Sequence, residues 1–232
     1  MLYKINPTIL NSFTYLESSQ HYCEARAPGE EEKVSKYEEQ SRQFIKQLDK
    51  TFVLNTDAGH RGNELESLIE ARTRDVAFAD LSIKHLAHLN RSLLERNIDE
   101  IANIVRGGSW QVKVEKVIQD DLTGDTYLLN GKVDVFSNTS SLIYDIKYTE
   151  KRKLYKFENS LQHRLYMLCT DVNQFSYLIS NGVDWWREDY RRNLLMDTTF
   201  ILNSIRGMRS WINERPEAQQ AFEKHWNLSA IR

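Results

Sequence analysis

The sequence predicts an α+β fold formed by a single domain over residues 1–232. Nine glycines and three prolines in 232 residues are few, so we expect long helices and strands joined by short connections. The hydrophobic period is helical over residues 1–108, alternates from Ser109, and is helical again after residue 192. We therefore expect a helical N-terminal part (1–108), a sheet core (109–192) and C-terminal helices (193–232).

Helical signals divide the N-terminal part into segments. Asn6 and Pro7 form a helix start, because Asn caps the first backbone N–H groups and Pro fits the first turn. Gly107 and Gly108 end the last helix of this part. The expected segments are a helix from residue 6, a polar loop over 18–32, a helix over 31–48, a break at 57–62, and helices over 63–79 and 81–105.

Alternation predicts strands in the sheet core. Trp110, Val112 and Val114 alternate with polar residues, and Asn181-Gly182 is a strong hairpin signal. The expected elements are strands from 109 and over 127–136 and 142–148, a helix over 159–170, strands over 174–179 and 183–190, and helices from 193 onward.

Composition excludes several classes of protein. Hydrophobic residues at 41% and charged residues at 28% are typical of a folded chain rather than a disordered one. No apolar run reaches the roughly 18 residues of a membrane helix, and the N-terminus lacks the pattern of a secretory signal. Cys23 and Cys169 cannot form a disulfide framework or a four-cysteine metal site. We therefore expect a cytoplasmic protein with no membrane partner.

The net charge of −2 conceals an asymmetry along the chain. Residues 147–232 contain 14 basic and 10 acidic residues, whereas residues 1–146 contain 17 basic and 23 acidic ones. This uneven distribution of charge is consistent with an electropositive binding surface on an otherwise acidic protein. It is equally consistent with charges scattered over a solvated surface.

Two aspartates and a lysine stand around a predicted hairpin. Asp145 and Lys147 share one strand face, because residues two apart in a strand point the same way. A turn about residues 138–140 places Asp134 opposite or nearly opposite Asp145. Two facing carboxylates repel each other, and a Mg²⁺ ion between them would remove the repulsion.

The pattern of Gly131, Asp134, a short hairpin and Asp145-Ile146-Lys147 resembles the motif of the PD-(D/E)xK nuclease superfamily, especially its RecB-like and lambda-exonuclease-like branches. The resemblance implies a central mixed β-sheet of the restriction-endonuclease-like type flanked by helices. It implies that Asp134, Asp145 and the Ile146 carbonyl bind Mg²⁺ or Mn²⁺, and that Lys147 orients or deprotonates the attacking water.

Two flanking segments extend the resemblance. Gln162 and Tyr166 lie on one helix face and are similar to the Gln-x-x-x-Tyr element beside the active site of RecB-like nucleases. By themselves they are better explained as a partly buried amide and aromatic ring on an amphipathic helix, and their position after Asp145-Ile146-Lys147 favours the resemblance. Residues 6–13 resemble the helix that precedes the RecB-like core. Some relatives carry an iron–sulfur cluster on four cysteines, which a chain with two cysteines cannot bind.

The family often supplies a further metal-binding glutamate from a helix upstream of the strands. Glu66 matches this position best, and Glu64 and Glu70 are alternatives. His60, just before this helix, is close enough in sequence to approach the metal. An ordinary solvated helix face would explain the same residues.

Basic residues follow the proposed catalytic strand and are expected to contact nucleic acid. Basic side chains bind phosphates, and aromatic rings stack on frayed bases. Core packing is the better explanation for at least one of Trp185 and Trp186, and the basic run equally suits a solvated face. The expected nucleic-acid-binding residues are Lys151, Arg152, Lys153, Lys156, Arg191 and Arg192.

The resulting hypothesis is a Mg²⁺- or Mn²⁺-dependent DNA nuclease, with an exonuclease of recombination, repair or DNA processing as its specific form. Double-stranded DNA ends or single-stranded DNA are the expected partners, together with a second copy of the chain or a recombination or repair protein. A non-cleaving nuclease-fold module that binds DNA or protein is one alternative. An α+β interaction protein whose acids form surface ion pairs is another.

Overall fold

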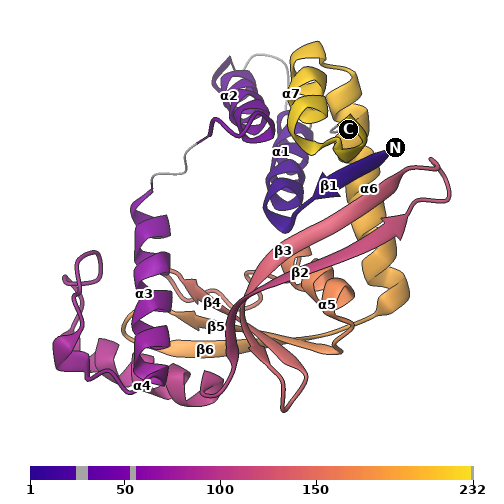
Figure 1. Ribbon diagram of the computed structural model, residues 1–232. Coiled ribbons are helices and arrows are strands. Elements are labelled where there is room, and N and C mark those ends of the chain that lie inside the picture. Colours follow the sequence, from indigo (N-terminus) through magenta and orange to yellow (C-terminus); the bar gives the residue numbers. More distant parts are fainter. Residues whose placement is uncertain (25–30, 53–55, 231–232) are drawn as a thin grey trace.

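The computed structural model describes residues 1–24, 31–52 and 56–230. It contains a mixed six-stranded sheet with helices on both faces (Figure 1), which confirms the expected α+β class. The elements are β1 (Leu2–Ile5), α1 (Pro7–Glu24), α2 (Glu31–Leu48), α3 (Asp57–Thr73), the short helix η1 (Phe78–Asp80), α4 (Arg91–Val105), β2 (Ser109–Gln119), β3 (Thr126–Ser137), β4 (Leu142–Tyr148), α5 (Leu161–Thr170), β5 (Gln174–Ser180), β6 (Trp185–Arg191), α6 (Leu194–Asn213), α7 (Pro216–Trp226) and the short helix η2 (Leu228–Ala230).

The helix boundaries differ from the prediction in several places. Helix α3 ends at Thr73, short of the expected end at residue 79, and Phe78–Asp80 form the separate short helix η1. Helix α1 continues to Glu24, so the expected loop over 18–32 begins too early, and its residues 25–30 lie outside the described residues. The expected break at 57–62 is wrong, because these residues form the first turns of α3. Thr56 caps α3 by accepting the Gly59 N–H at 3.2 Å, and this cap offsets the weak helix propensity of glycine. Helix α4 begins only at Arg91, where Asn90 caps it.

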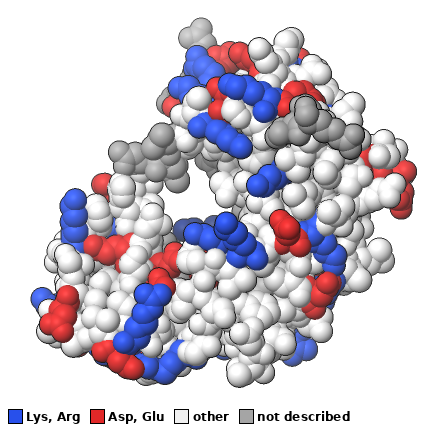
Figure 2. Space-filling model, in the orientation of Figure 1, with Lys and Arg blue, Asp and Glu red and all other residues white. Residues whose placement is uncertain are grey.

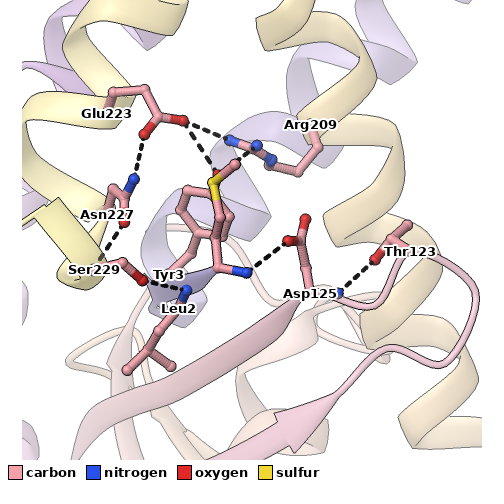
Figure 3. A network of polar contacts seen from close by, with 9 residues as sticks. Leu2, Tyr3, Thr123, Asp125, Arg209, Glu223, Asn227 and Ser229 are labelled. Atoms are coloured by element: carbon pink, nitrogen blue, oxygen red, sulfur yellow. Dashed lines mark hydrogen bonds and ion pairs between the residues drawn. The ribbon is translucent and has the colours of Figure 1, made fainter.

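Strand β1 was not predicted, so residues 1–108 are not wholly helical. It pairs in parallel with β3, matching Leu2 to Thr126, and four residues are too few to produce a periodic signal. A polar network attaches this strand to the C-terminal helices (Figure 3). In it, Ser229 Oγ accepts the Leu2 N–H at 2.8 Å, and Arg209 Nη2 donates to the Tyr3 hydroxyl at 3.0 Å.

Strand β3 organises the sheet, and its two edges differ. Strand β2 pairs antiparallel along one edge. On the other edge, β1 pairs with residues 126–129 and β4 pairs with residues 135–137. In the part of the chain that the structure describes, residues 130–134 therefore have no strand partner on that edge. We call this opening the strand gap.

Two hydrophobic cores lie on opposite faces of the sheet. One contains buried residues of α1, α2, α5, α6 and α7, and the other contains those of α3 and α4. Leu142, Tyr144 and Ile146 belong to the α3/α4 core, which confirms the alternation expected for this strand. Among the described residues, no helix is long and apolar enough to cross a bilayer.

Candidate active site

Asp134 lies at the end of the strand gap, next to β4. The β3–β4 pairing ends at Val135 and Tyr144, so the next position along the register places Asp134 opposite Asp145. Instead of a backbone pair, Asp134 Oδ2 accepts the Ile146 N–H at 2.9 Å. The aspartate side chain thus satisfies a backbone donor that the interrupted ladder leaves free.

Asp145 is fully buried, with 0% of its surface exposed, and Gln162 and Lys147 both contact it. Gln162 Nε2 donates to Asp145 Oδ1 at 2.8 Å, and the Lys147 ammonium forms an ion pair with Asp145 Oδ2. The Lys147 side chain as a whole is 27% exposed, although the carboxylate that it contacts is fully buried. The structure therefore brings together three of the residues expected from sequence.

Glu66 reaches the same cluster from α3. The carboxylates of Asp134 and Glu66 influence each other electrostatically, and the Gln111 side-chain amide from β2 donates to Glu66 Oε1. Glu64, the sequence alternative, instead accepts the backbone N–H groups of Lys84 and Leu86 at 2.6 Å each. Glu66 is thus the better placed of these two carboxylates.

The other two sequence alternatives on this helix have separate partners. Glu70 forms an ion pair with Arg74, one turn further along α3. The His60 ring stacks on His85 with 4.8 Å between the ring centroids.

Tyr166 closes the strand gap. Its hydroxyl donates to the Lys132 carbonyl at 2.8 Å, and its ring lies against Gly131, where an added Cβ would come within 2.4 Å of Cε1. The two residues of the Gln-x-x-x-Tyr pattern therefore have different partners. Gln162 hydrogen-bonds to Asp145, and Tyr166 hydrogen-bonds to the β3 backbone two residues before Asp134.

The close approach at Gly131 predicts that Gly131→Ala will disturb the site. The buried Tyr166 ring must move, and overpacking of this kind costs about 1–3 kcal/mol, which corresponds to a drop of roughly 5 °C in melting temperature. Displacement of the hydroxyl from Lys132 should also lower cleavage activity. Gly62→Ala is the matched control, because a Cβ at Gly62 meets nothing within 4 Å. A melting temperature for Gly131→Ala equal to that of the wild type would contradict the packing argument.

Burial and mutual repulsion raise the pKa values of the carboxyl groups. Burial, followed by the Asp134 charge, raises the pKa of Asp145 to about 7 and the pKa of Glu66 to about 7. Burial also raises the pKa of Asp134, against the opposing charge of Lys147. Burial alone would lower the pKa of Lys147, but the Asp145 and Asp134 carboxylates outweigh it and raise that pKa.

The donor set suits a hard divalent cation. Asp145 Oδ2 is buried and faces the Lys147 ammonium, and carboxylate and carbonyl oxygens are the ligands that Mg²⁺ and Mn²⁺ prefer. No group of three His, Cys, Asp or Glu side chains within the described residues converges closely enough to bind a metal ion as it stands. Instead, Lys147 contacts Asp145, and Gln111 contacts Glu66.

A basic cavity of about 580 Å³ adjoins the strand gap. Lys4, Lys113 and Lys132 line it, one from each of β1, β2 and β3, with Glu115 as the acidic residue of its lining and Tyr166 at its edge. The three ammonium groups make this cavity, referred to below as the lysine cavity, electropositive, and it suits a phosphate group. In Figure 2, Lys and Arg side chains also gather beside the hollow next to α3.

The basic residues expected to bind nucleic acid lie in varied surroundings. Lys151, Arg152, Lys153, Lys156 and Arg191 are exposed. The Arg152 guanidinium lies 5.5 Å from the centroid of Trp186, which is buried as the core-packing alternative expected. Lys156 Nζ donates to Thr149 Oγ1 at 3.1 Å. Arg192 pairs with Asp171 at 2.9 Å, so its charge is partly neutralised within the chain.

Sequence reasoning missed Gln111 and the lysine cavity. Lys132 had a detectable signal, because it lies two residues before Asp134 and so on the same strand face. Lys4 and Lys113 had none, since strand pairing brings them together from distant parts of the chain. Gln111, which contacts Glu66, has a positive φ, and no sequence pattern marks that conformation.

Comparison with known proteins finds solved structures with a similar arrangement of the chain at low sequence identity. No family model matches the chain, and no curated protein matches it. Similar solved structures include an alkaline exonuclease from Laribacter hongkongensis, at 13% identity and a TM-score of 0.41 over 95% of this chain and 94% of that chain. The complex of that exonuclease with dAMP has 13% identity and a TM-score of 0.40 over 95% of this chain and 90% of that chain. A phage-related exonuclease from Haemophilus somnus has 13% identity and a TM-score of 0.32 over 72% of this chain and 83% of that chain.

Proposed function

We propose that this protein is a metal-dependent nuclease that hydrolyses phosphodiester bonds in DNA. The observation that carries the proposal is the convergence of Asp134, Asp145, Lys147 and Gln162 beside the strand gap, with Glu66 approaching from α3. Buried acids with raised pKa values and one ammonium group are typical of a catalytic cluster. An ordinary surface ion pair would have no need of a fully buried carboxylate.

Asp134, Asp145 and the Ile146 carbonyl would hold Mg²⁺ or Mn²⁺, with Glu66 as a further ligand. When bound, such a cation polarises the phosphate and lowers the pKa of a coordinated water. Gln162 fixes the orientation of Asp145 through its 2.8 Å hydrogen bond, and Tyr166 fixes the backbone before Asp134. These two residues would keep the carboxylates in place during the reaction.

Lys147 would orient or deprotonate the attacking water and stabilise the charge that develops on the phosphate. Its ammonium contacts Asp145 and lies 6.0 Å from the centroid of the Tyr177 ring. A partly exposed cation next to buried acids is placed to meet a phosphate that approaches from solvent.

The lysine cavity and the exposed basic residues after β4 would contact the DNA backbone. Ammonium groups bind phosphates without reading sequence, so the surface suits a non-specific nuclease acting on duplex ends or single strands. We propose an exonuclease of recombination, repair or DNA processing as the specific form of this activity. A second copy of the chain or a recombination or repair protein would then be its protein partner.

Incubation with DNA and Mn²⁺ tests the proposal. End-labelled linear duplex, circular duplex and single-stranded DNA are compared with and without a chelator. We expect cleavage that requires the cation, that spares the circle if the enzyme needs an end, and that is lost in Lys147→Ala. Binding of DNA without cleavage of any substrate would favour the non-cleaving module instead. Equal cleavage by the wild type and Lys147→Ala would refute the site assignment.

A further inference from the structure

Gln111 has a backbone conformation that is unusual for a residue inside a strand. Its φ is 54°, in the left-handed region that side chains with a Cβ rarely adopt. The other described non-glycine residues with positive φ lie outside strands and helices; they are Lys50, Asp75, Ser141, Tyr155 and Asp171. A distortion within β2 therefore calls for a local cause.

The distortion lies directly opposite Asp134. The β2–β3 ladder pairs Trp110 with Val135 and Val112 with Val133, and it skips the pair between Gln111 and Asp134. Asp134 thus lacks a ladder partner on the β2 side at Gln111, and on the β4 side its carboxylate takes the Ile146 N–H. Both neighbouring strands change their pairing at this aspartate.

The Gln111 side chain uses this conformation to reach α3. Its amide donates to Glu66 Oε1 across 45 residues of sequence, and both side chains are partly buried. The Glu66 carboxylate is repelled by Asp134 and Glu70. Without a donor it would be free to turn away from the other acids, so the amide holds a carboxylate in an electrostatically unfavourable place.

We propose that Gln111 is a positioning residue that fixes Glu66 beside Asp134 for cation binding. The inference rests on the proposed function, since Glu66 is taken there as a further metal ligand. Hydrogen-bond partners of metal ligands typically change metal affinity about 10- to 100-fold when removed. A residue that only tied α3 to β2 would instead change stability and leave cation affinity unaltered.

The test measures Mn²⁺ binding to the full chain by calorimetry and thermal unfolding by circular dichroism. Gln111→Met keeps the side-chain length and removes the donor. Gln111→Gly removes the side chain and also relieves the positive φ. Gln119→Met, on an exposed position of the same strand, is the matched control.

We expect Gln111→Met and Gln111→Gly to weaken Mn²⁺ binding about tenfold or more, and Gln119→Met to leave it unchanged. Gln111→Gly should melt at the wild-type temperature or above it, because glycine adopts the left-handed conformation without strain. Cleavage by both Gln111 variants should recover at saturating Mn²⁺, because ligand positioning acts on cation affinity.

Two results would overturn the inference in distinguishable ways. Wild-type binding of Mn²⁺ with unchanged affinity in both Gln111 variants, whatever their melting temperatures, would refute the positioning role and leave the proposed function intact. Absence of Mn²⁺ binding by the wild type would refute the proposed function, and the positioning role with it.

Discussion

Replacement of Lys147 by methionine is expected to reduce DNA cleavage by about a thousandfold or more, on the scale of an electrostatic or acid–base catalytic group. Methionine keeps most of the side-chain length and removes the charge. The ion pair with Asp145 is then lost, and no ammonium remains to orient water or to meet charge on the phosphate. Single-turnover cleavage of end-labelled linear duplex with Mn²⁺ measures the effect.

A second readout separates catalysis from folding in this variant. Loss of the ammonium removes the positive charge that offsets the repulsion among Asp134, Asp145 and Glu66. The variant should therefore melt below the wild type near neutral pH. Mn²⁺ should restore much of that loss by supplying positive charge. Cleavage at the wild-type rate by the Lys147→Met protein would show that Lys147 is not part of the machinery.

Lys151→Met is the matched control. Lys151 is exposed in the segment that follows β4, and contacts of this kind with phosphate act through affinity. Its loss should weaken DNA binding modestly, reduce the salt dependence of binding, and leave the single-turnover rate at saturating protein within about tenfold of the wild type.

Strand β4 and its polar face could be predicted because their signals are local. Alternation over residues 142–148 assigns Asp145 and Lys147 to one face, and a spacing of four in a helix assigns Gln162 and Tyr166 to another. The structure confirms the contacts of Gln162 and Lys147 with Asp145. Each of these inferences needed only a repeating geometry that extends over a few residues.

The rest of the site depends on contacts between distant segments. Strand β1 has four residues and gains its stability from β3 and the C-terminal helices. Its parallel pairing places Lys4 near Lys132, which no local pattern predicts. The positive φ of Gln111 is equally invisible, because glutamine has no preference for the left-handed region that would mark the position.

The strand gap explains why polar side chains gather at this point of the fold. A ladder that ended without compensation would leave buried N–H and C=O groups unpaired. Here the Asp134 carboxylate accepts the Ile146 N–H and the Tyr166 hydroxyl donates to the Lys132 carbonyl. Of these two side chains, Tyr166 also lines the lysine cavity, and Asp134 lies beside Asp145 in the acidic cluster.

Mn²⁺ binding is expected to weaken about a hundredfold or more between about pH 8 and about pH 5.5, because a cation must displace protons from its ligands. The pKa of Asp145 and the pKa of Glu66 are each raised to about 7. Below that value both groups are protonated in the folded protein, and affinity falls roughly tenfold per pH unit for each proton displaced. Calorimetric titration at three pH values measures the slope.

The cation-free protein should show the opposite trend in stability. Both carboxyl pKa values are raised above those of the unfolded chain, so between about pH 4.5 and about pH 7 the folded state binds more protons than the unfolded state. Its free energy of unfolding should therefore fall as the pH rises through this window and level off above it. Added Mn²⁺ should remove the fall, since it replaces the protons as the neutralising charge.

Asp145→Asn and Asp121→Asn make the interpretation specific. Asp145→Asn should abolish the increase in melting temperature caused by Mn²⁺ and reduce the pH dependence of stability, because one of the two raised carboxyl groups is gone. Asp121 is an exposed carboxylate in the β2–β3 turn, so Asp121→Asn should retain both effects. Mn²⁺ affinity that stays constant across the pH range would mean that the cation binds away from the buried acids.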